Sequence, residues 1–551
     1  MQAPRTTAPA VGALCLLLTA TACTSGSGAD PAPRARKLTM STPSATGSLD
    51  SVTWNLPMGE PRTLDSAKIA DYSPSTVKAN LCDSLLRLKP DYSIAPALAS
   101  SWSRPSPTTL ILNIREGVRF WDGRPLTADD VVASLLRQKD RATQSVNLSL
   151  LANVKTITAT GTHQVTVDFK APDEMFLKSL ATSFGTVNEA AYMRKAGRSY
   201  GSANGRLMCS GPFKLTSWKP GESITATRNA NYWDASLRPK VRKLTFKFIT
   251  DGSTLTSALL SGQVDGSYEI NSSSARALQA SDVGSLYYGP SAQTNFIAAI
   301  GSGSPLADHK IAEALSLVLD RDALIKNVYA GAAQKLKTFI PPLVWQHGAA
   351  SGVYAKGNDT LPAVPAVNVD KARKLVGQAN TRRRTLTIAM AAGDQQTQQT
   401  LTFLQAGAKR IGLKIVIKQL QPTQMSGLFF DASLREGLDA TMVLGYVEIP
   451  DPLSYAQLLT APTSPFNWTN YRNTKVTSLL AQAQATMRPK TSAALFTQAQ
   501  ALYSKDLPVV PLASPHERMF LNKRLSGAPA SFAYINMPWA AHLGGTGKGT
   551  S

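Results

Sequence analysis

Ser75 and Lys78 have the types and the spacing of a nucleophile and its activating base. Residues 75–78 read STVK, which fits the S-x-x-K pattern of serine enzymes that react with β-lactams. Residues 145–147 (SVN) and 490–492 (KTS) loosely fit the two companion motifs of those enzymes. Patterns this short are expected by chance in a chain of 551 residues. They therefore leave a serine enzyme only as an alternative.

Other patterns that carry chemistry are missing from the sequence. There is no G-x-S-x-G segment, and His516-Glu517 lacks the second histidine of a zinc-binding helix. Lys548 follows glycines but lacks the adjacent serine or threonine of a phosphate-binding loop. The 5 histidines are widely scattered, so we expect no metal site.

The N-terminus has the pattern of an export signal. Residues 11–22 form an apolar, small-residue run that is too short to span a bilayer but suits a signal-peptide core. Residues 20–23 (ATAC) resemble a bacterial lipobox, with Ala20 in place of the usual leucine. Cleavage there would leave Cys23 as a lipidated N-terminus, followed by a flexible Ser/Gly/Pro tether. A plain secretory signal with an incidental cysteine is the alternative.

The remaining cysteines are Cys82 and Cys209, since Cys15 and Cys23 belong to the export signal. An exported chain meets oxidising surroundings, which favours a disulfide between two leftover cysteines. Two buried free thiols are the alternative.

Composition narrows the class of protein. The chain is long enough for two or three domains with sizeable cores, and 43% of its residues are hydrophobic. Its formal net charge is +22, but the longest basic run is only residues 382–384. A nucleic-acid-binding protein would concentrate its Lys and Arg residues. We therefore expect a uniformly basic surface, suited to residence beside an anionic membrane, and no nucleic-acid partner.

The elements that must position any site follow from periodicity. Leu110, Leu112 and Ile114 recur at every second position, which predicts a half-buried strand. Thr127, with Asp130 three residues later, predicts the capped start of a helix. Further strands are predicted at 241–248 and 440–446, a helix at 493–503, and a long loop at 339–367.

Two segments flank that first strand and carry a family signature. Residues 96–102 (PALASSW) and 120–131 (FWDGRPLTADDV) closely resemble the signature of extracytoplasmic solute-binding proteins of the oligopeptide, dipeptide and nickel family, which serve ABC importers. Residues 210–215 (SGPFKL) and 259–265 (LLSGQVD) resemble later motifs of the same family. The resemblance covers roughly residues 50–540 in unbroken order.

The resemblance implies an α/β fold of the periplasmic-binding-protein type, with two lobes and an additional domain (class C). It also places both remaining cysteines in one lobe. The expected parts are a signal peptide at 1–22, a lipidated tether at 23–49, lobe I at 50–88, 205–290 and 506–543, an additional domain at 89–204, lobe II at 291–505, and a disordered tail at 544–551.

The resemblance also implies ligand contacts. Glu448 follows the strand near 445 at the position where peptide receptors of the family bind the α-amino group of the ligand, although the usual residue is Asp. A buried ammonium needs such a charged acceptor. Met442 replaces an arginine that some members use. Three aromatic residues and one amide occupy segments that face the cleft in relatives: Tyr72, Tyr446, Trp468 and Asn295. A solvated loop acid and plain packing are the alternative interpretations.

The implied function is capture of an oligopeptide at the outer face of the cytoplasmic membrane by hinge closure, and its delivery to an ABC permease. The protein would be a lipid-anchored monomer without cofactors that catalyses no reaction, since ATP hydrolysis belongs to the partner ATPase subunits. A nickel chelate, an oligosaccharide or another solute is the alternative ligand. A lipid-anchored, penicillin-interacting serine enzyme is the alternative of another class.

Overall fold

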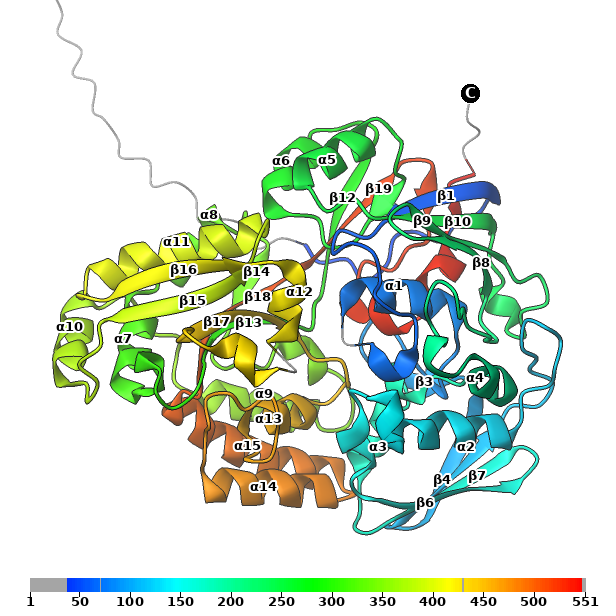
Figure 1. Ribbon diagram of the computed structural model, residues 1–551, viewed down its shortest axis with the longest axis horizontal. Coiled ribbons are helices and arrows are strands. Elements are labelled where there is room, and N and C mark those ends of the chain that lie inside the picture. Colours follow the sequence, from blue (N-terminus) through cyan, green and yellow to red (C-terminus); the bar gives the residue numbers. More distant parts are fainter. Residues whose placement is uncertain (1–36, 70, 429–430, 548–551) are drawn as a thin grey trace, which may run out of the picture. The chain divides into compact units, whose positions relative to one another are not determined.

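The computed structural model describes residues 37–547, apart from residue 70 and residues 429–430. Within these residues the chain forms three larger sheets of seven, six and four strands, with helices packed around them (Figure 1). The expected α/β fold is confirmed. No helix in this described part is long and apolar enough to cross a membrane. The expected signal peptide at 1–22 and Cys23 lie outside the described residues.

The seven-stranded sheet gathers segments from the two ends and the middle of the chain. Its strands, in spatial order, are β12 (Gly284–Gly289), β19 (Glu517–Asn522), β11 (Gly266–Ser267), β1 (Leu49–Asn55), β10 (Val241–Lys247), β9 (Ser223–Arg228) and β8 (Phe213–Lys219). The short helices α5 (Gly252–Leu260) and α6 (Ala275–Gln279) lie between its strands in sequence. Val52 and Trp54 alternate along β1 and are completely buried, because alternate side chains of a strand share one face. The Trp54 ring packs 4.4 Å from the ring of Trp539.

The six-stranded sheet belongs mostly to the second half of the chain. Its order is β14 (Ala333–Lys335), β18 (Val509–Pro515), β13 (Gln293–Ala299), β17 (Ala440–Tyr446), β15 (Thr385–Ala391) and β16 (Lys414–Leu420). Its helices are α7 (His309–Val318), α8 (Arg321–Asn327), α10 (Val369–Gln378), α11 (Gln395–Lys409) and α12 (Pro422–Gly427) (Figure 1). Apolar side chains of α7, α10 and α11 share one core with the sheet. The strand predicted at 440–446 is confirmed.

The chain changes from one sheet to the other between β18 and β19, which are separated only by His516. We expected the whole segment 506–543 in one lobe, but β18 pairs with β13 of the six-stranded sheet. Residues of β18 are buried along its whole length. A strand that is apolar on both faces carries no pattern to indicate which sheet it joins, so the sequence could not reveal this change.

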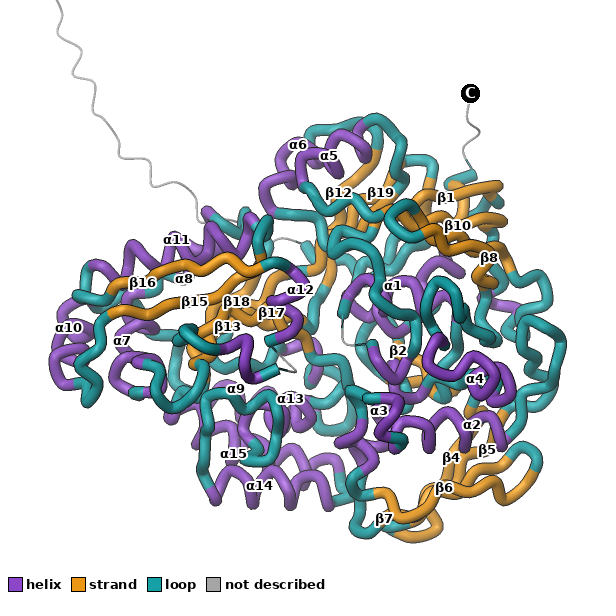
Figure 2. Tube along the Cα trace, in the orientation of Figure 1, coloured by secondary structure: helices purple, strands orange, loops and turns teal. Residues whose placement is uncertain are grey.

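The four-stranded sheet is formed by residues 99–169 in the order β4 (Ala99–Ser106), β5 (Thr109–Ile114), β7 (Gln164–Phe169) and β6 (Val154–Gly161), visible as adjacent orange strands in Figure 2. Helix α2 (Ala128–Leu136) lies between β5 and β6 in the sequence, and helices α3 (Glu174–Ser179) and α4 (Ala190–Ala196) follow β7. The predicted capping box of α2 is confirmed: the Thr127 amide donates to the Asp130 carboxylate at 3.0 Å. The short strands β2 (Leu86–Leu88) and β3 (Ile94–Pro96) pair with each other and precede β4 in the sequence.

A helical group completes the second half of the chain. It consists of α9 (Ser351–Thr360), α13 (Pro452–Thr460), α14 (Thr474–Ala485) and α15 (Pro489–Asp506). The helix predicted at 493–503 lies inside α15. The prediction of a long loop at 339–367 is wrong, because α9 forms within it and the ring of its Tyr354 packs on Phe496 of α15 at 5.6 Å. This tertiary contact outweighs the Gly- and Pro-rich composition of the segment.

The two ends of the described chain are packed against each other. The Thr42 amide donates to the Ala528 carbonyl at 2.9 Å, and the Gly47 amide donates to the Gly545 carbonyl at 3.0 Å. Strand β21 (Gly544–Gly545) pairs with β20 (Leu525–Ser526). The expectations of a free tether up to residue 49 and a disordered tail from 544 are therefore wrong for 41–49 and 544–545. A Cβ on Gly544 would lie 2.5 Å from the Gly47 carbonyl oxygen, so glycine serves close packing here rather than flexibility.

Helix α1 (Tyr72–Leu81) is tied to the core at its C-terminal end. Cys82 follows the helix and forms a disulfide with Cys209, which lies just before β8. Both cysteines are buried in the same large apolar core. The bond joins two points that are 127 residues apart in sequence, so it fixes α1 against the segment that leads into the seven-stranded sheet.

Candidate ligand-binding site

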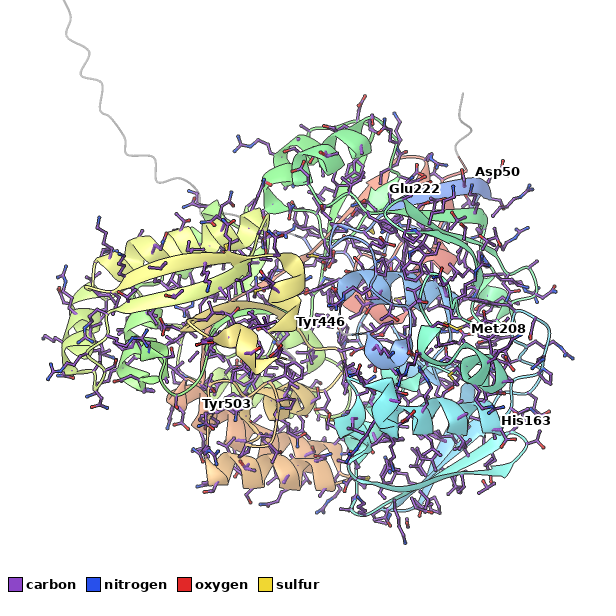
Figure 3. All side chains as sticks on the ribbon, viewed as in Figure 1. Asp50, His163, Met208, Glu222, Tyr446 and Tyr503 are labelled. Carbon is purple, nitrogen blue, oxygen red and sulfur yellow. A yellow bond between two sulfur atoms is a disulfide. The ribbon has the colours of Figure 1, made fainter. Side chains whose placement is uncertain are left out.

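Four aromatic residues meet where the two largest sheets approach each other. Tyr72 is the first residue of α1, Tyr446 is the last residue of β17, and Phe532 and Tyr534 belong to the 3-10 helix Phe532–Asn536. The Tyr72 ring lies 4.9 Å from Tyr446 and 5.9 Å from Phe532, and Tyr446 lies 5.4 Å from Phe532. We call these four residues the aromatic cluster. Figure 3 shows Tyr446 at the end of its strand that faces α1.

Two carboxyl groups lie beside the aromatic cluster. Glu269 follows β11 and accepts hydrogen bonds at Oε1 from Gln293 Nε2 (2.8 Å) and from the Tyr534 hydroxyl (3.1 Å). The amide of Glu269 donates to Glu517 Oε1 at 2.9 Å. Glu517 begins β19 and is 1% exposed. Burial raises the pKa of Glu517 to about 7. Burial, and then the charge of Glu517, raise the pKa of Glu269 well above its ordinary value.

Arg518 is the cation beside these carboxyls, and it is almost fully buried. Its guanidinium donates to the Ile270 carbonyl, to Ser272 Oγ at 2.6 Å and to Gln396 Oε1 at 3.0 Å. Gln396 belongs to α11, so Arg518 connects the seven-stranded sheet to a helix of the six-stranded sheet. The backbone amide of Arg518 donates to Glu517 Oε1 at 3.0 Å, and its guanidinium forms no direct ion pair with the two carboxyl groups among the described residues.

Glu448 lies two residues beyond β17 and is half-buried. Its Oε1 accepts from Ser183 Oγ at 2.8 Å, from the Ser183 amide at 3.3 Å and from Asn536 Nδ2 at 3.3 Å. The segment around it is held by an ion pair between Lys178 and Asp451 and by a hydrogen bond from the Tyr92 hydroxyl to the Val447 carbonyl at 3.0 Å. Glu448 is therefore a fixed carboxylate in a structured junction, and not a solvated loop acid.

Lys78 and Ser75 do not form the pair that the S-x-x-K pattern suggested. Ser75 Oγ donates to the Asp71 carbonyl at 2.7 Å, and Lys78 Nζ donates to Thr186 Oγ1 at 3.2 Å. Burial lowers the pKa of Lys78 to about 8, against the opposing charges of Glu448 and Asp83. The Ser75 proton is directed to a backbone carbonyl, so the geometry offers no base to activate this hydroxyl.

One of the four expected contact residues, Trp468, lies away from the aromatic cluster. Trp468 packs beside Ala389, Leu428 and Leu438, and its carbonyl accepts from the Gly301 amide at 3.0 Å. Tyr446 pairs with the opposite end of β13, at Gln293. Six steps of about 3.3 Å from Gln293 to Ala299 put roughly 20 Å between the two ends of this strand. Asn295 is buried within β13 and donates to the Tyr329 hydroxyl at 2.9 Å.

Sequence reasoning missed four residues of the site: Phe532, Tyr534, Glu269 and Glu517. The signal for Glu517 was present, because Glu517-Arg518 is a charged pair within the mainly apolar run 509–521. Charged residues are rarely buried without a specific partner or role, so this pair pointed to a site. The two aromatic residues had no such local signal.

The fold and the site define an α/β protein in which aromatic rings and carboxyl groups from segments of its two largest sheets meet. Residues 93–467, more than half of the chain, match the family model of bacterial extracellular solute-binding proteins, family 5, in its middle region. The chain therefore belongs to family 5 of the bacterial extracellular solute-binding proteins, which act outside the cytoplasm.

Relatives and solved structures agree with this assignment. The glutathione-binding protein GsiB of Shigella dysenteriae is 25% identical over 457 residues, which cover 82% of this chain and 86% of that protein. The oligopeptide-binding protein AppA of Bacillus subtilis, solved with a nonapeptide, has a TM-score of 0.77 at 18% identity and covers 90% of this chain and 99% of its own. NikA of Staphylococcus aureus, solved with Ni(L-His)2, has a TM-score of 0.74 at 19% identity, with 88% and 98% covered. The two structural likenesses establish the fold.

Proposed function

We propose that this protein captures oligopeptides outside the cytoplasmic membrane and delivers them to an ABC permease, whose ATPase subunits drive import. The observation that carries the proposal is the aromatic cluster, which joins α1 and the segment 532–536 to the tip of β17. Tyr534 and Asn536 of that segment donate hydrogen bonds to the carboxyl groups of Glu269 and Glu448. Aromatic faces can bury a ligand without demanding one particular side chain. The relatives named for glutathione and for a nonapeptide support a peptide ligand.

The proposed mechanism is closure of two lobes over the ligand. Lobe I comprises the seven-stranded sheet, with residues 50–88, 205–290 and the chain from Glu517 onward, and residues 89–204 form the additional domain. Lobe II comprises residues 291–515. The chain passes between the lobes at 290–292 and at His516, and these two short crossings form the proposed hinge. A ligand that contacts Tyr72 in lobe I and Tyr446 in lobe II favours the closed state.

Glu448 is the proposed anchor for the α-amino group of the peptide. We expect Glu448→Gln to weaken the binding of trialanine roughly tenfold, because a charge-assisted hydrogen bond is replaced by a neutral one. Isothermal titration calorimetry measures the two dissociation constants. N-acetyl-trialanine is the matched ligand, since it lacks the ammonium group and should bind the wild type and Glu448→Gln equally weakly. An unchanged affinity for trialanine in Glu448→Gln would disprove the anchor.

The proposed attachment is a lipid on Cys23 after removal of residues 1–22. We expect Cys23→Ala to move the protein from the membrane fraction to the soluble fraction of a bacterial host, because a lipid chain is the proposed membrane contact. Immunoblots of the two fractions measure this. Continued recovery of Cys23→Ala with the membranes would contradict the lipid anchor.

A nickel chelate is the second candidate ligand, because NikA shares the fold and was solved with Ni(L-His)2. Native mass spectrometry of the freshly purified protein separates the two candidates. A co-purified molecule that fragments at amide bonds supports the peptide, and a nickel isotope pattern supports the chelate. The serine-enzyme alternative receives no support from the hydrogen bonds of Ser75 and Lys78, and we do not propose it.

A further inference from the structure

A small cavity lies against the first turn of α1, next to the aromatic cluster. Its walls include Tyr72, Ser73, Tyr268, Glu269 and Tyr534. The rings of Tyr268 and Tyr534 stack in parallel with their centroids 3.7 Å apart, so each ring covers one face of the other. Glu448 does not line this cavity, and its carboxylate is bonded to Ser183 and Asn536.

One buried polar atom on the wall of this cavity lacks a partner within the described part of the chain. Ser73 is 3% exposed and its Oγ makes no hydrogen bond there, although the residue lines the cavity. Leaving a buried polar group unsatisfied is costly, so the unpaired Ser73 hydroxyl indicates a place where a polar ligand group is accommodated.

The backbone of Glu269 is also unusual. Its φ angle is +57°, in the left-handed region that residues other than glycine seldom occupy. Strained backbone of this kind persists where the surrounding structure enforces it, commonly at ligand sites. Here the hydrogen bond from its amide to Glu517 and those from Gln293 and Tyr534 to its carboxyl group hold the residue in place.

The charges around the cavity are unbalanced. The charged and titratable groups that influence Glu269 are Glu517, Tyr534, Arg518 and Asp71. Together with Glu269 itself these are five groups, of which three are carboxyls, one is a phenol and one is a guanidinium. The guanidinium already donates hydrogen bonds to Ile270, Ser272 and Gln396. A cation that entered the cavity would offset the repulsion between Glu269 and Glu517, and an anion would add to it.

We propose that this cavity receives the side-chain ammonium group of a lysine in the bound peptide. Glu269 pairs with the ammonium, Ser73 Oγ accepts one of its hydrogen bonds, and the Tyr72 ring on the cavity wall adds cation–π attraction. An ammonium group is about the size of a water molecule, which suits a cavity this small better than a planar guanidinium. The inference rests on the proposed peptide function and specifies its ligand class as lysine-containing peptides.

Three tripeptides test this inference by calorimetry: Ala-Lys-Ala, Ala-norleucine-Ala and Ala-Glu-Ala. Norleucine matches the aliphatic length of lysine without the charge. We expect the wild type to bind the lysine peptide at least tenfold more tightly than the norleucine peptide, and the glutamate peptide most weakly. Because this comparison uses the wild type alone, it does not depend on any variant folding.

Two variants locate the effect. Glu269→Gln should reduce the preference for lysine over norleucine to less than threefold. Glu222→Gln, which changes an exposed acid in the turn between β8 and β9 (Figure 3), should leave the preference intact. Equal affinities for all three peptides in the wild type, or an unchanged preference in folded Glu269→Gln, would overturn the inference and leave the peptide function standing. No binding of any peptide would overturn the peptide function itself.

Discussion

Replacing both Cys82 and Cys209 by alanine is expected to lower the free energy of unfolding by about 4 kcal/mol. The disulfide closes a loop over a sequence separation of 127 residues. In the chain-entropy model, a loop of this size stabilises the folded state by about 5 kcal/mol, and losses of about 2–5 kcal/mol are typical on removal. Alanine is the better substitute, because serine would bury a new hydroxyl in an apolar core. Urea unfolding of the wild type and the double variant measures the difference.

The oxidation state is the control for this prediction. The wild type in reductant should unfold at nearly the same urea concentration as the double variant, and adding reductant should not affect the double variant. Mass spectrometry of an unreduced digest should show the peptides of Cys82 and Cys209 joined. A loss of stability below 1 kcal/mol in the double variant, or separate peptides without reductant, would refute the structural role of this bond.

Glu517→Gln is expected to stabilise the protein at pH 8 by about 2–3 kcal/mol and to change its stability little at pH 4.5. Burial raises the pKa of Glu517 from 4.5 to about 7 in the folded state. Between these values the folded protein keeps a proton that the unfolded chain has lost. The contribution of Glu517 is therefore fully present below pH 4.5 and is lost as the pH rises through 7. Glutamine cannot ionise, so it removes this dependence, and its oxygen can still accept the hydrogen bond from the Glu269 amide.

Urea unfolding at pH 4.5, 6, 7 and 8 measures this effect. The difference between Glu517→Gln and the wild type should grow with pH and level off above pH 7. The free energy of unfolding of the variant should itself still fall as the pH rises, because burial also raises the pKa of Glu269. The exposed acid in Glu222→Gln serves as the control and should give a curve parallel to that of the wild type. Parallel curves for Glu517→Gln would show that this carboxyl titrates normally in the folded protein.

Local signals were sufficient to predict much of the fold. The capping box of Thr127 and Asp130 could be predicted because it involves two residues only three positions apart. The strand at 440–446 could be predicted because it is a short, mainly apolar run. The family motifs at 96–131 added the arrangement of sheets that periodicity alone could not supply. The change of sheet at His516 could not be predicted, because β18 and β19 are both buried along their whole length and no turn-forming glycine separates them in the sequence.

The site depends on contacts between residues that are far apart in sequence. Tyr72 was chosen as a contact residue, but nothing near it in the chain indicates that Phe532 packs against it. Trp468 and Tyr446 looked equivalent in the sequence, yet they contact opposite ends of β13. Which aromatic residues converge is decided by the pairing of strands, and that pairing is set by the whole sheet.

The hydrogen bonds between Gly47 and Gly545 bring the first and last packed segments of the chain into one antiparallel bridge. Neighbouring termini of this kind allow a circular permutant, in which a short linker joins residue 545 to residue 47 and the chain is opened at an exposed turn such as Gly221. The same proximity affects where a tag can be placed. A bulky fusion after residue 547 would lie beside the packed segment 41–49 and could disturb it. An epitope inserted in the exposed turn at Gly221 avoids this contact.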